Sequence, residues 1–422
     1  MATSSFERGL FVLSLAVLSI VYGMAAQKWG WFPSQIANRA YEQAQASFTD
    51  NPFSYLVPRV YDHNGARRLG SGAMQPGVTL VSSMWMDEGE WAPEIRLLDS
   101  SGATIHKWAI REDLFAREGY VHGTHLRPSG DLLVNIEYVG TVRFDACGRV
   151  RWQLPKKTHH SIARAEDGSF WIPAQMGSPT TEYGGLDDPV VPEQILQVSP
   201  SGEVLERIDV TEVLLENDLE RYFFKRHGPH PRGELMHVND VEPLPAGMAA
   251  SYPIFDPGDL LVSLRDLHLV FVFDPDTRDV KWHAFGPFIR QHDPDFMGDG
   301  RIGIFDNNPD GTHRGTVLGG SRIVVLRPPS DSMSVLYPTA RSDSFYTEAA
   351  GKWQGLANGN LLLTEAQAGR VVEVSRDGAP VWEYVRTPRG HRVPEILDGT
   401  RYDLTAEDVN AWSCSVDDDD AP

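Results

Sequence analysis

Residues 292–305 read HDPDFMGDGRIGIF, in which a histidine is followed eight positions later by Gly300 and then by a short alternating apolar run. The pair Asp299-Gly300 is a strong signal for a tight turn, and the run after it has the period-two pattern of a strand. The stretch therefore predicts a β-hairpin with His292 at the head of its first strand. A hairpin does not need a histidine there, which makes any recurrence of the pattern informative.

The same spacing recurs along the chain. A residue that opens one strand is followed eight positions later by glycine and then by a second apolar strand. The pairs are His122 and Gly130, His160 and Gly168, Asn239 and Gly247, His292 and Gly300, and Gly351 and Gly359. A third and a fourth strand follow, and an opening copy that ends at Trp108 has lost or relocated its first strand. Six such units of about forty residues predict an all-β fold, a six-bladed β-propeller over residues 76–390.

The composition agrees with this fold and excludes some partners. The chain of 422 residues holds 38 glycines and 29 prolines, as expected of many short strands joined by turns. Hydrophobic residues make up 41% of it, which is enough for a sizeable core. The 58 acidic residues outnumber the 38 basic ones and give a net charge of −20. That charge argues against nucleic acid as a partner and against adsorption to anionic lipid.

Both ends of the chain fall outside the repeat. Residues 10–26 form an uncharged apolar run, at the short limit for a membrane span and long for a signal-peptide core. We interpret residues 1–30 as an uncleaved membrane anchor, with a cleaved signal as the close alternative. Either interpretation predicts export of the rest of the chain to the periplasmic or extracytoplasmic side. Residues 31–75 are expected to form a stalk or leader, and residues 391–422 an extension with an acidic tail. The two cysteines, Cys147 and Cys414, are equally compatible with a disulfide and with free thiols.

Propeller geometry gives the opening residues a common location. The first strand of each blade is innermost, so a residue that opens it lies at one mouth of the central channel. His237 lies two positions before Asn239 and so on the same face of its strand, because side chains alternate along a strand. By the same alternation, Asp240 and Asp293 are expected to point away from the channel. The predicted ring consists of His122, His160, His237, Asn239, His292 and Gly351.

A ring of histidines supports metal ligation, acid–base catalysis or nucleophilic attack. No glycine-rich phosphate loop and no catalytic carboxylate pair accompanies the ring in the sequence. Arg265, at the end of a neighbouring strand, would repel a metal but would bind a tetrahedral oxyanion, and Lys352 is a second cation of this sort. Two alternatives stay open: a propeller metalloenzyme with a histidine-ligated metal, and a non-catalytic binding propeller tethered to the membrane.

Four stretches of the chain resemble the bacterial arylsulfotransferase family, whose exported members do not use adenosine-based sulfate donors. They are HVNDVEPL at 237–244, GDLLVSLRDLHLVFVFDPDTRDVKW at 258–282, QHDPDFMGDGRIGIFDNN at 291–308 and GLANGNLLLTEAQAGRVVEVSRDGAPVWEY at 355–384. The resemblance covers roughly residues 76–390 and implies a six-bladed propeller. It also implies that a sulfuryl group moves from an aryl sulfate to a phenol in a ping-pong reaction, without metal or cofactor. The β-sandwich domain of better-known members is missing here, so their dimerisation is not implied.

The resemblance also implies roles for single residues. His292 matches the nucleophile that carries the sulfuryl group as a sulfohistidine. His160, His237, Asn239 and Arg265 match positions that hold the sulfuryl oxygens or manage protons, with His160 as the acid for the leaving phenolate and His159 as the alternative match. His122 and Lys352 are expected to join Asn239 in binding the substrate. Helical spacing of apolar residues within 209–228 further predicts a short helix that walls an aromatic substrate.

Overall fold

The computed structural model describes residues 5–29, 56–87, 90–111, 114–115, 120–177, 180, 183, 190–225 and 235–412. The chain divides into two units, Met1–Tyr55 and Leu56–Pro422. Most of the expected stalk, residues 30–55, and the acidic tail, residues 413–422, lie outside the described residues.

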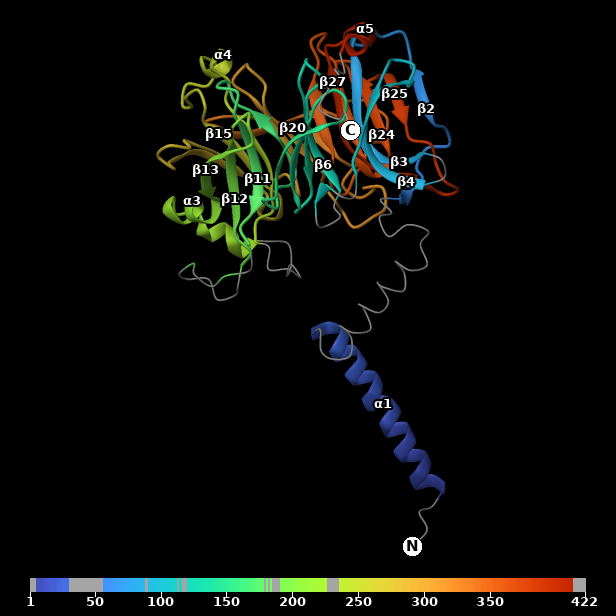
Figure 1. Ribbon diagram of the computed structural model, residues 1–422. Helices are drawn as coiled ribbons and strands as arrows, with labels where there is room; N and C mark the ends of the chain where they lie inside the picture. The colour runs from blue at the N-terminus through green and yellow to red at the C-terminus, as the bar shows by residue number, and fades with distance from the viewer. Residues whose placement is uncertain are drawn as a thin grey trace, which may run out of the picture. The chain divides into compact units, whose positions relative to one another are not determined.

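The described part of the first unit is the helix α1 (Ser5–Trp29), which includes the apolar run noted above (Figure 1). In the part of the chain that the structure describes, no helix is long and apolar enough to cross a membrane. This finding includes α1, in which the membrane anchor was expected.

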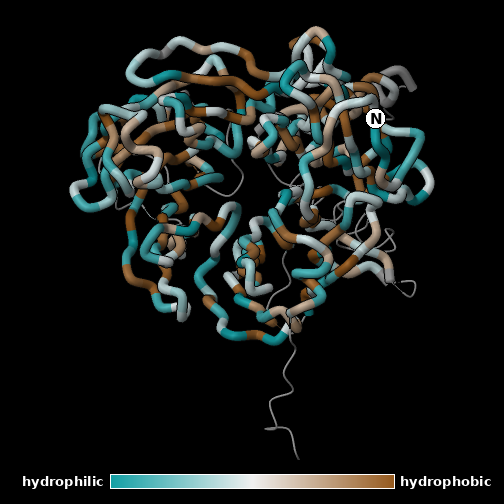
Figure 2. The backbone as a smooth tube through the Cα atoms, turned by 90° about the horizontal axis from the view of Figure 1, so that it is seen from above, coloured by the Kyte–Doolittle hydropathy of each residue, from teal (hydrophilic) through white to brown (hydrophobic). Residues whose placement is uncertain are grey.

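The second unit is the predicted six-bladed propeller, in which six antiparallel sheets surround one axis (Figures 1 and 2). From the inner to the outer strand, blade 1 consists of β27 (Ile396–Tyr402), β3 (Val78–Asp87), β4 (Glu90–Leu98) and β5 (Thr104–Ala109), and blade 2 of β6 (Val121–Leu126), β7 (Leu132–Ile136), β8 (Gly140–Phe144) and β9 (Val150–Leu154). Blade 3 consists of β10 (Ala163–Arg164), β11 (Phe170–Gln175), β12 (Glu193–Val198) and β13 (Val204–Asp209), and blade 4 of β14 (Val238–Pro243), β15 (Leu260–Leu264), β16 (Leu269–Phe273) and β17 (Val280–Phe285). Blade 5 consists of β18 (His292–Phe296), β19 (Ile302–Asp306), β20 (Arg322–Arg327) and β21 (Ser330–Tyr337), and blade 6 of β22 (Lys352–Gly355), β23 (Leu361–Glu365), β24 (Arg370–Val374), β25 (Pro380–Val385) and a fifth strand, β2 (Gly65–Arg68).

Short elements connect and flank the blades. The strand β1 (Leu56–Pro58) pairs with β26 (Arg392–Pro394). The α-helices are α3 (Val210–Glu216), α4 (Ala246–Ala249) and α5 (Ala406–Asn410), and the 3-10 helices are η2 (Glu220–Lys225), η3 (Arg265–Leu267) and η4 (Ala366–Ala368).

The middle strands of the blades form the core because both of their faces are covered. Strand β16, LVFVF, is buried at every position, which explains its continuous apolar sequence. Between blades 4 and 5, Leu261 and Val270 pack with Ile302 and Ile304 in one cluster. Each such side chain contributes about 1.5–3 kcal/mol when fully buried. The outer strand β13 instead alternates between covered and more exposed positions, as a half-buried strand does.

The ring of blades is closed by pairing the two ends of the propeller. Strand β27, near the C-terminus, pairs with β3 and supplies the inner strand that the first repeat lacks. This strand lies beyond residue 390, the boundary expected for the propeller, because a sequence repeat does not show which distant strand closes a ring. Strand β2, from the expected leader, likewise joins blade 6 by pairing with β25.

Candidate active site

The predicted ring residues meet in a cavity of about 50 Å³ on the axis, to which every blade contributes. We name this cavity the ring cavity. The expected residues that line it are His122, His160, Asn239, His292, Gly351 and Lys352. The other two expected residues adjoin it: His237 Nε2 lies 3.2 Å from His160 Nε2, and the backbone N–H of Arg265 donates to the carbonyl of His237 over 3.1 Å. The residues that the sequence pattern selected therefore lie together in one cluster.

The backbone around the ring cavity is held in left-handed conformations. The φ angles are 54° at His160, 57° at His237, 48° at Asp293 and 55° at Ala350, although none of these residues is glycine. Such conformations cost of the order of 1–3 kcal/mol each and persist only where the surroundings enforce them. At Gly123 a Cβ atom would lie 1.8 Å from the carbonyl oxygen of His160, so only glycine lets blades 2 and 3 approach this closely.

His292 is oriented by two oxygen atoms. Its Nδ1 lies 2.6 Å from the side-chain oxygen of Asn307 and 3.1 Å from the carbonyl of Arg290. Both are acceptors, so Nδ1 carries the hydrogen and Nε2 keeps its lone pair. Burial, and then the nearby charge of Arg265, hold the pKa of His292 well below its ordinary value of 6.5. A neutral imidazole with a lone pair on Nε2 is the form that can act as a nucleophile.

His160 stands at the centre of a chain of imidazoles. Its Nδ1 lies 2.9 Å from Nδ1 of His159, and its Nε2 lies 3.2 Å from Nε2 of His237. Its ring also lies 3.8 Å from that of His122, centre to centre. Burial, followed by the charges of His122 and His237, holds the pKa of His160 well below 6.5. Each nitrogen pair shares one hydrogen, so the chain provides a route along which a proton can move.

A buried carboxylate anchors this chain. Glu193 in β12 is fully buried and accepts the backbone N–H groups of His237 and Val238 over 2.6 and 3.0 Å. The same carboxylate lies 4.0 Å from Nε2 of His159. On the other side, the Asn135 amide donates to the carbonyls of both His159 and His160. These contacts fix the two strand openings of blades 3 and 4 relative to each other.

Asn239 and His122 line the ring cavity, and Arg265 adjoins it through its backbone contact with His237. The side-chain oxygen of Asn239 is buried without a hydrogen-bond donor, while its amide nitrogen donates to the carbonyl of Gln291 over 2.7 Å. Nδ1 of His122 likewise has no hydrogen-bond partner and lies 3.7 Å from Glu137. The guanidinium of Arg265 pairs with Asp266 through Nε over 2.8 Å.

Carboxylates line the channel where the sequence placed none. Asp240 and Asp293 both face the ring cavity, because β14 and β18 each contain a bulge that breaks the simple alternation. The expectation that they point away is therefore wrong. Burial, and then Asp293, raises the pKa of Asp240 to about 8. The acid Asp398 enters from β27 and lies 3.5 Å from Nζ of Lys352. Burial alone would lower the pKa of Lys352, but Asp398 and Asp293 outweigh it and raise that pKa.

The arrangement of the ring side chains bears on the metalloenzyme alternative. Among them, no group of three or more histidine, cysteine, aspartate or glutamate side chains has the arrangement needed to hold a metal ion. His160 and His292 direct ring nitrogens at His159, His237 and Asn307 instead.

The expected helical wall over the channel belongs to the core. Helix α3 and η2 form within 209–228 as predicted, and Asp209 caps α3 by accepting two of its first N–H groups. Val213, Leu214, Leu219 and Phe223, however, are buried in the cluster that joins blades 3 and 4. The helical spacing therefore reflects packing against the propeller.

Three functional neighbours were missed or left open by the sequence. Asn307 and Glu193 orient the ring histidines directly, and His159 belongs to the imidazole chain together with His160. Asn307 lies in the quoted stretch FDNN, where polar residues directly follow a buried strand, and this was the available signal.

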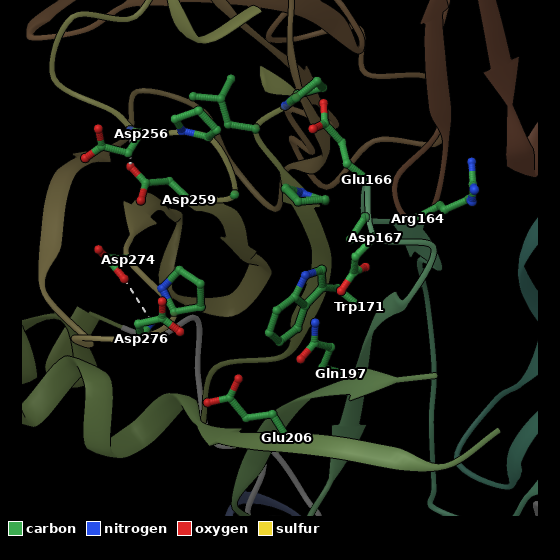
Figure 3. A pocket seen from close by; sticks show the side chains of 17 residues that line it. Arg164, Glu166, Asp167, Trp171, Gln197, Glu206, Asp256, Asp259, Asp274 and Asp276 are labelled. Atoms are coloured by element: carbon green, nitrogen blue, oxygen red, sulfur yellow. Dashed lines mark hydrogen bonds between the residues drawn. The ribbon is translucent and has the colours of Figure 1, made fainter. Parts of the chain in front are cut away.

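A second cavity of about 360 Å³ lies between blades 3 and 4, near the ends of β10 and β14 that point away from the ring (Figure 3). We name it the interblade pocket. Seven carboxylates and the indole of Trp171 line it: Glu166, Asp167, Glu206, Asp256, Asp259, Asp274 and Asp276. Most are already engaged. Lys281 Nζ, for example, lies 2.7 Å from Asp256 and 2.8 Å from Asp259.

Comparison with known proteins adds a family and several similar folds. The model of the arylsulfotransferase (ASST) family matches residues 140–387. No curated protein matches the chain. A protein of unknown function from Bacteroides caccae is similar in structure, with a TM-score of 0.49 and 13% identity over 76% of this chain and 99% of its own. A catalytically inactive variant of virginiamycin B lyase from Staphylococcus aureus, solved with quinupristin, aligns with a TM-score of 0.42 and 9% identity over 78% of this chain and 98% of its own.

Proposed function

The chain belongs to the arylsulfotransferase family, and from this premise we propose that it moves a sulfuryl group from an aryl sulfate to a phenol by a ping-pong reaction through His292. The observation that carries the proposal is the state of His292. Its Nδ1–H is bound to two oxygens, its pKa is held low, and its Nε2 lone pair belongs to a side chain that lines the ring cavity.

In the first half-reaction, the lone pair of His292 Nε2 forms a bond to sulfur while the bond between sulfur and the aryl oxygen breaks. The electron pair of that bond leaves with the aryl oxygen, which takes a proton from His160 and departs as a phenol. His160 is neutral in the free protein because of its lowered pKa. The negative charge of a bound sulfate ester would favour its protonated form, since opposite charges stabilise each other.

In the second half-reaction, the oxygen of an acceptor phenol attacks the sulfur of the sulfohistidine. The N–S bond breaks, its electron pair returns to Nε2, and the phenol proton passes to His160. The enzyme regains its starting state, so no external oxidant, reductant or metal is required. The chain through His159 and His237 allows the proton taken from the acceptor phenol to be shared among neighbouring imidazoles until the next donor binds.

Charge on the sulfuryl oxygens needs donors in the transition state. Arg265 is the main cation proposed for this role, and its effect on the pKa of His292 supports its proximity to the reacting nitrogen. His237 and His122 would donate further hydrogen bonds, and Asn239 would contact the substrate. Lys352 is proposed to act at longer range, because the channel carboxylates surround it.

We further propose that the protein works outside the cytoplasm. Cys147 is disulfide-bonded, and disulfides persist mainly in oxidising compartments. The other cysteine of the chain, Cys414, lies outside the described residues.

Mass spectrometry of the intact protein after brief exposure to a chromogenic aryl sulfate tests the proposal. We expect one added sulfuryl group, which peptide mapping places on His292 and which a phenol then removes. A label on His160 instead would contradict the assignment of the nucleophile. If neither label nor transfer to a panel of phenols is detected, the protein is better described as a non-catalytic binding propeller. Near-stoichiometric iron held by the ring would support the metalloenzyme instead.

A further inference from the structure

The amide of Asn307 has only one orientation that satisfies its neighbours. It is fully buried directly after β19, and its side-chain nitrogen donates to the carbonyls of Thr347 and Ala350 over 3.0 and 2.7 Å. Turning the amide over would direct its oxygen at these two carbonyl oxygens and lose both hydrogen bonds. The oxygen of Asn307 is therefore fixed toward Nδ1 of His292, at 2.6 Å.

The residues on either side of Asn307 hold the same region together. Asp306 accepts the backbone N–H of Ile289 over 2.8 Å and pairs with Arg322. The amide of Asn308 donates to the carbonyl of Gly320 over 2.9 Å. Of these three side chains, only that of Asn307 contacts the imidazole of His292. The side chains of Asp306 and Asn308 bind other groups, and neither makes a hydrogen bond to His292.

We propose that Asn307 is a positioning residue that holds His292 as the tautomer with hydrogen on Nδ1, and that two carbonyls of the segment between blades 5 and 6 control this choice through the Asn307 amide. Ala350, one of these carbonyls, itself lines the ring cavity beside Gly351. The proposed nucleophile of blade 5 is thus oriented by the segment that leads into blade 6. The consequence for catalysis rests on the proposed function, whereas the tautomer does not.

The tautomer can be measured in the full-length protein labelled with ¹⁵N in its imidazole rings. Long-range proton–nitrogen correlation spectra distinguish a nitrogen that carries hydrogen from one with a lone pair, and His292→Gln identifies the signals of His292. In the wild-type protein we expect hydrogen on Nδ1. In Asn307→Ala, only the 3.1 Å contact with Arg290 still favours that form, so both tautomers should appear. Uptake of the sulfuryl label should slow by about 10- to 100-fold, as on loss of other residues that orient a reactive group.

Two further variants separate positioning from stability. Asn307→Asp keeps an acceptor for Nδ1 but loses both donated hydrogen bonds, so it should lower stability while keeping the tautomer and most of the labelling rate. Asn308→Gly removes the neighbouring amide at a φ of 49°, which glycine tolerates, and should change neither the tautomer nor the rate.

Several outcomes would overturn the inference. They are hydrogen on Nε2 of His292 in the wild-type protein, an unchanged tautomer in Asn307→Ala, and an equal loss of rate in folded Asn307→Asp and Asn307→Ala. If Asn307→Ala does not fold, the wild-type and Asn307→Asp spectra still decide. If the wild-type protein takes up no sulfuryl group, the proposed function fails, while the comparison of tautomers still tests the role of Asn307.

Discussion

The ring cavity and the interblade pocket differ in size, and they also differ in how fully their polar side chains are paired. The interblade pocket measures about 360 Å³ and the ring cavity about 50 Å³. In the larger one most of the acids are occupied: Glu206 pairs with Arg278, and Asp167 accepts the backbone N–H of Ser169. In the smaller one, the side-chain oxygen of Asn239 and Nδ1 of His122 have no hydrogen-bond partner, and His292 keeps a lone pair on Nε2. Unpaired polar atoms therefore favour the ring cavity as the candidate site, although it is the smaller of these two cavities.

The largest effect is expected from His292→Ala. Without the nucleophile neither half of a ping-pong reaction can proceed, so both label uptake and phenol release should be abolished. The fold should survive at a cost of about 1–3 kcal/mol, since the oxygen of Asn307 is left without its donor. Circular dichroism with chemical denaturation measures the second quantity. Appreciable transfer by the folded variant would refute the assignment.

Arg265→Ala should slow both half-reactions by roughly two to three orders of magnitude, as loss of a transition-state donor typically does. It should also raise the pKa of His292, because the charge of Arg265 helps to lower it. The acid limb of the pH–rate profile should therefore move to higher pH. Arg265→Lys is the matched control: it keeps the charge, so the limb should return toward its wild-type position. A slower rate with an unmoved limb would argue that Arg265 lies too far from the nucleophile.

The wild-type pH profile of label uptake should be level through pH 6.5 and fall only in more acidic solution. Attack needs the neutral imidazole, and His292 stays neutral down to a pKa well below the ordinary 6.5. Single-turnover labelling across the pH range measures this without interference from product release. A half-maximal rate at or above pH 6.5 is incompatible with the burial and charge found around His292.

The smallest effect on activity is expected in the interblade pocket. Lys281→Met leaves Asp259, which is 2% exposed, without its cation and should lower the free energy of unfolding by roughly 2 kcal/mol. The rate of sulfuryl transfer should stay unchanged in the folded protein. Lys281→Arg keeps the positive charge and should recover most of the stability. A rate that falls in Lys281→Met but not in Lys281→Arg would show that the two cavities are coupled.

The sequence predicted the blades and the ring because both depend on local spacing. Eight residues separate the head of an inner strand from the glycine of the next turn, and this register puts His122, His160 and His292 on one axis. Features that do not follow from local spacing along the chain were not predicted. The bulges that turn Asp240 and Asp293 inward arise from pairing with a second strand.

Long-range contacts explain the other differences. Glu193 of blade 3 binds the backbone of His237 at the start of blade 4, and Asn307 is oriented by carbonyls some forty residues further along the chain. The apolar residues of α3 repeat with helical spacing in either environment, so periodicity could not distinguish a substrate wall from core packing.

Because β27 completes the ring of blades, the site can form only after most of the chain has been synthesised. Asp398 on this strand lines the ring cavity and lies close to Lys352 of blade 6. It also accepts a hydrogen bond from the hydroxyl of Thr124 in blade 2 over 2.6 Å. A nascent chain that has completed β3 must keep that edge unpaired until some three hundred further residues have been made. No partial chain that ends before β27 can enclose the ring cavity. Activity would therefore appear all at once when the circle closes, and a cut close to the C-terminus would be as damaging as one through the nucleophile's own blade.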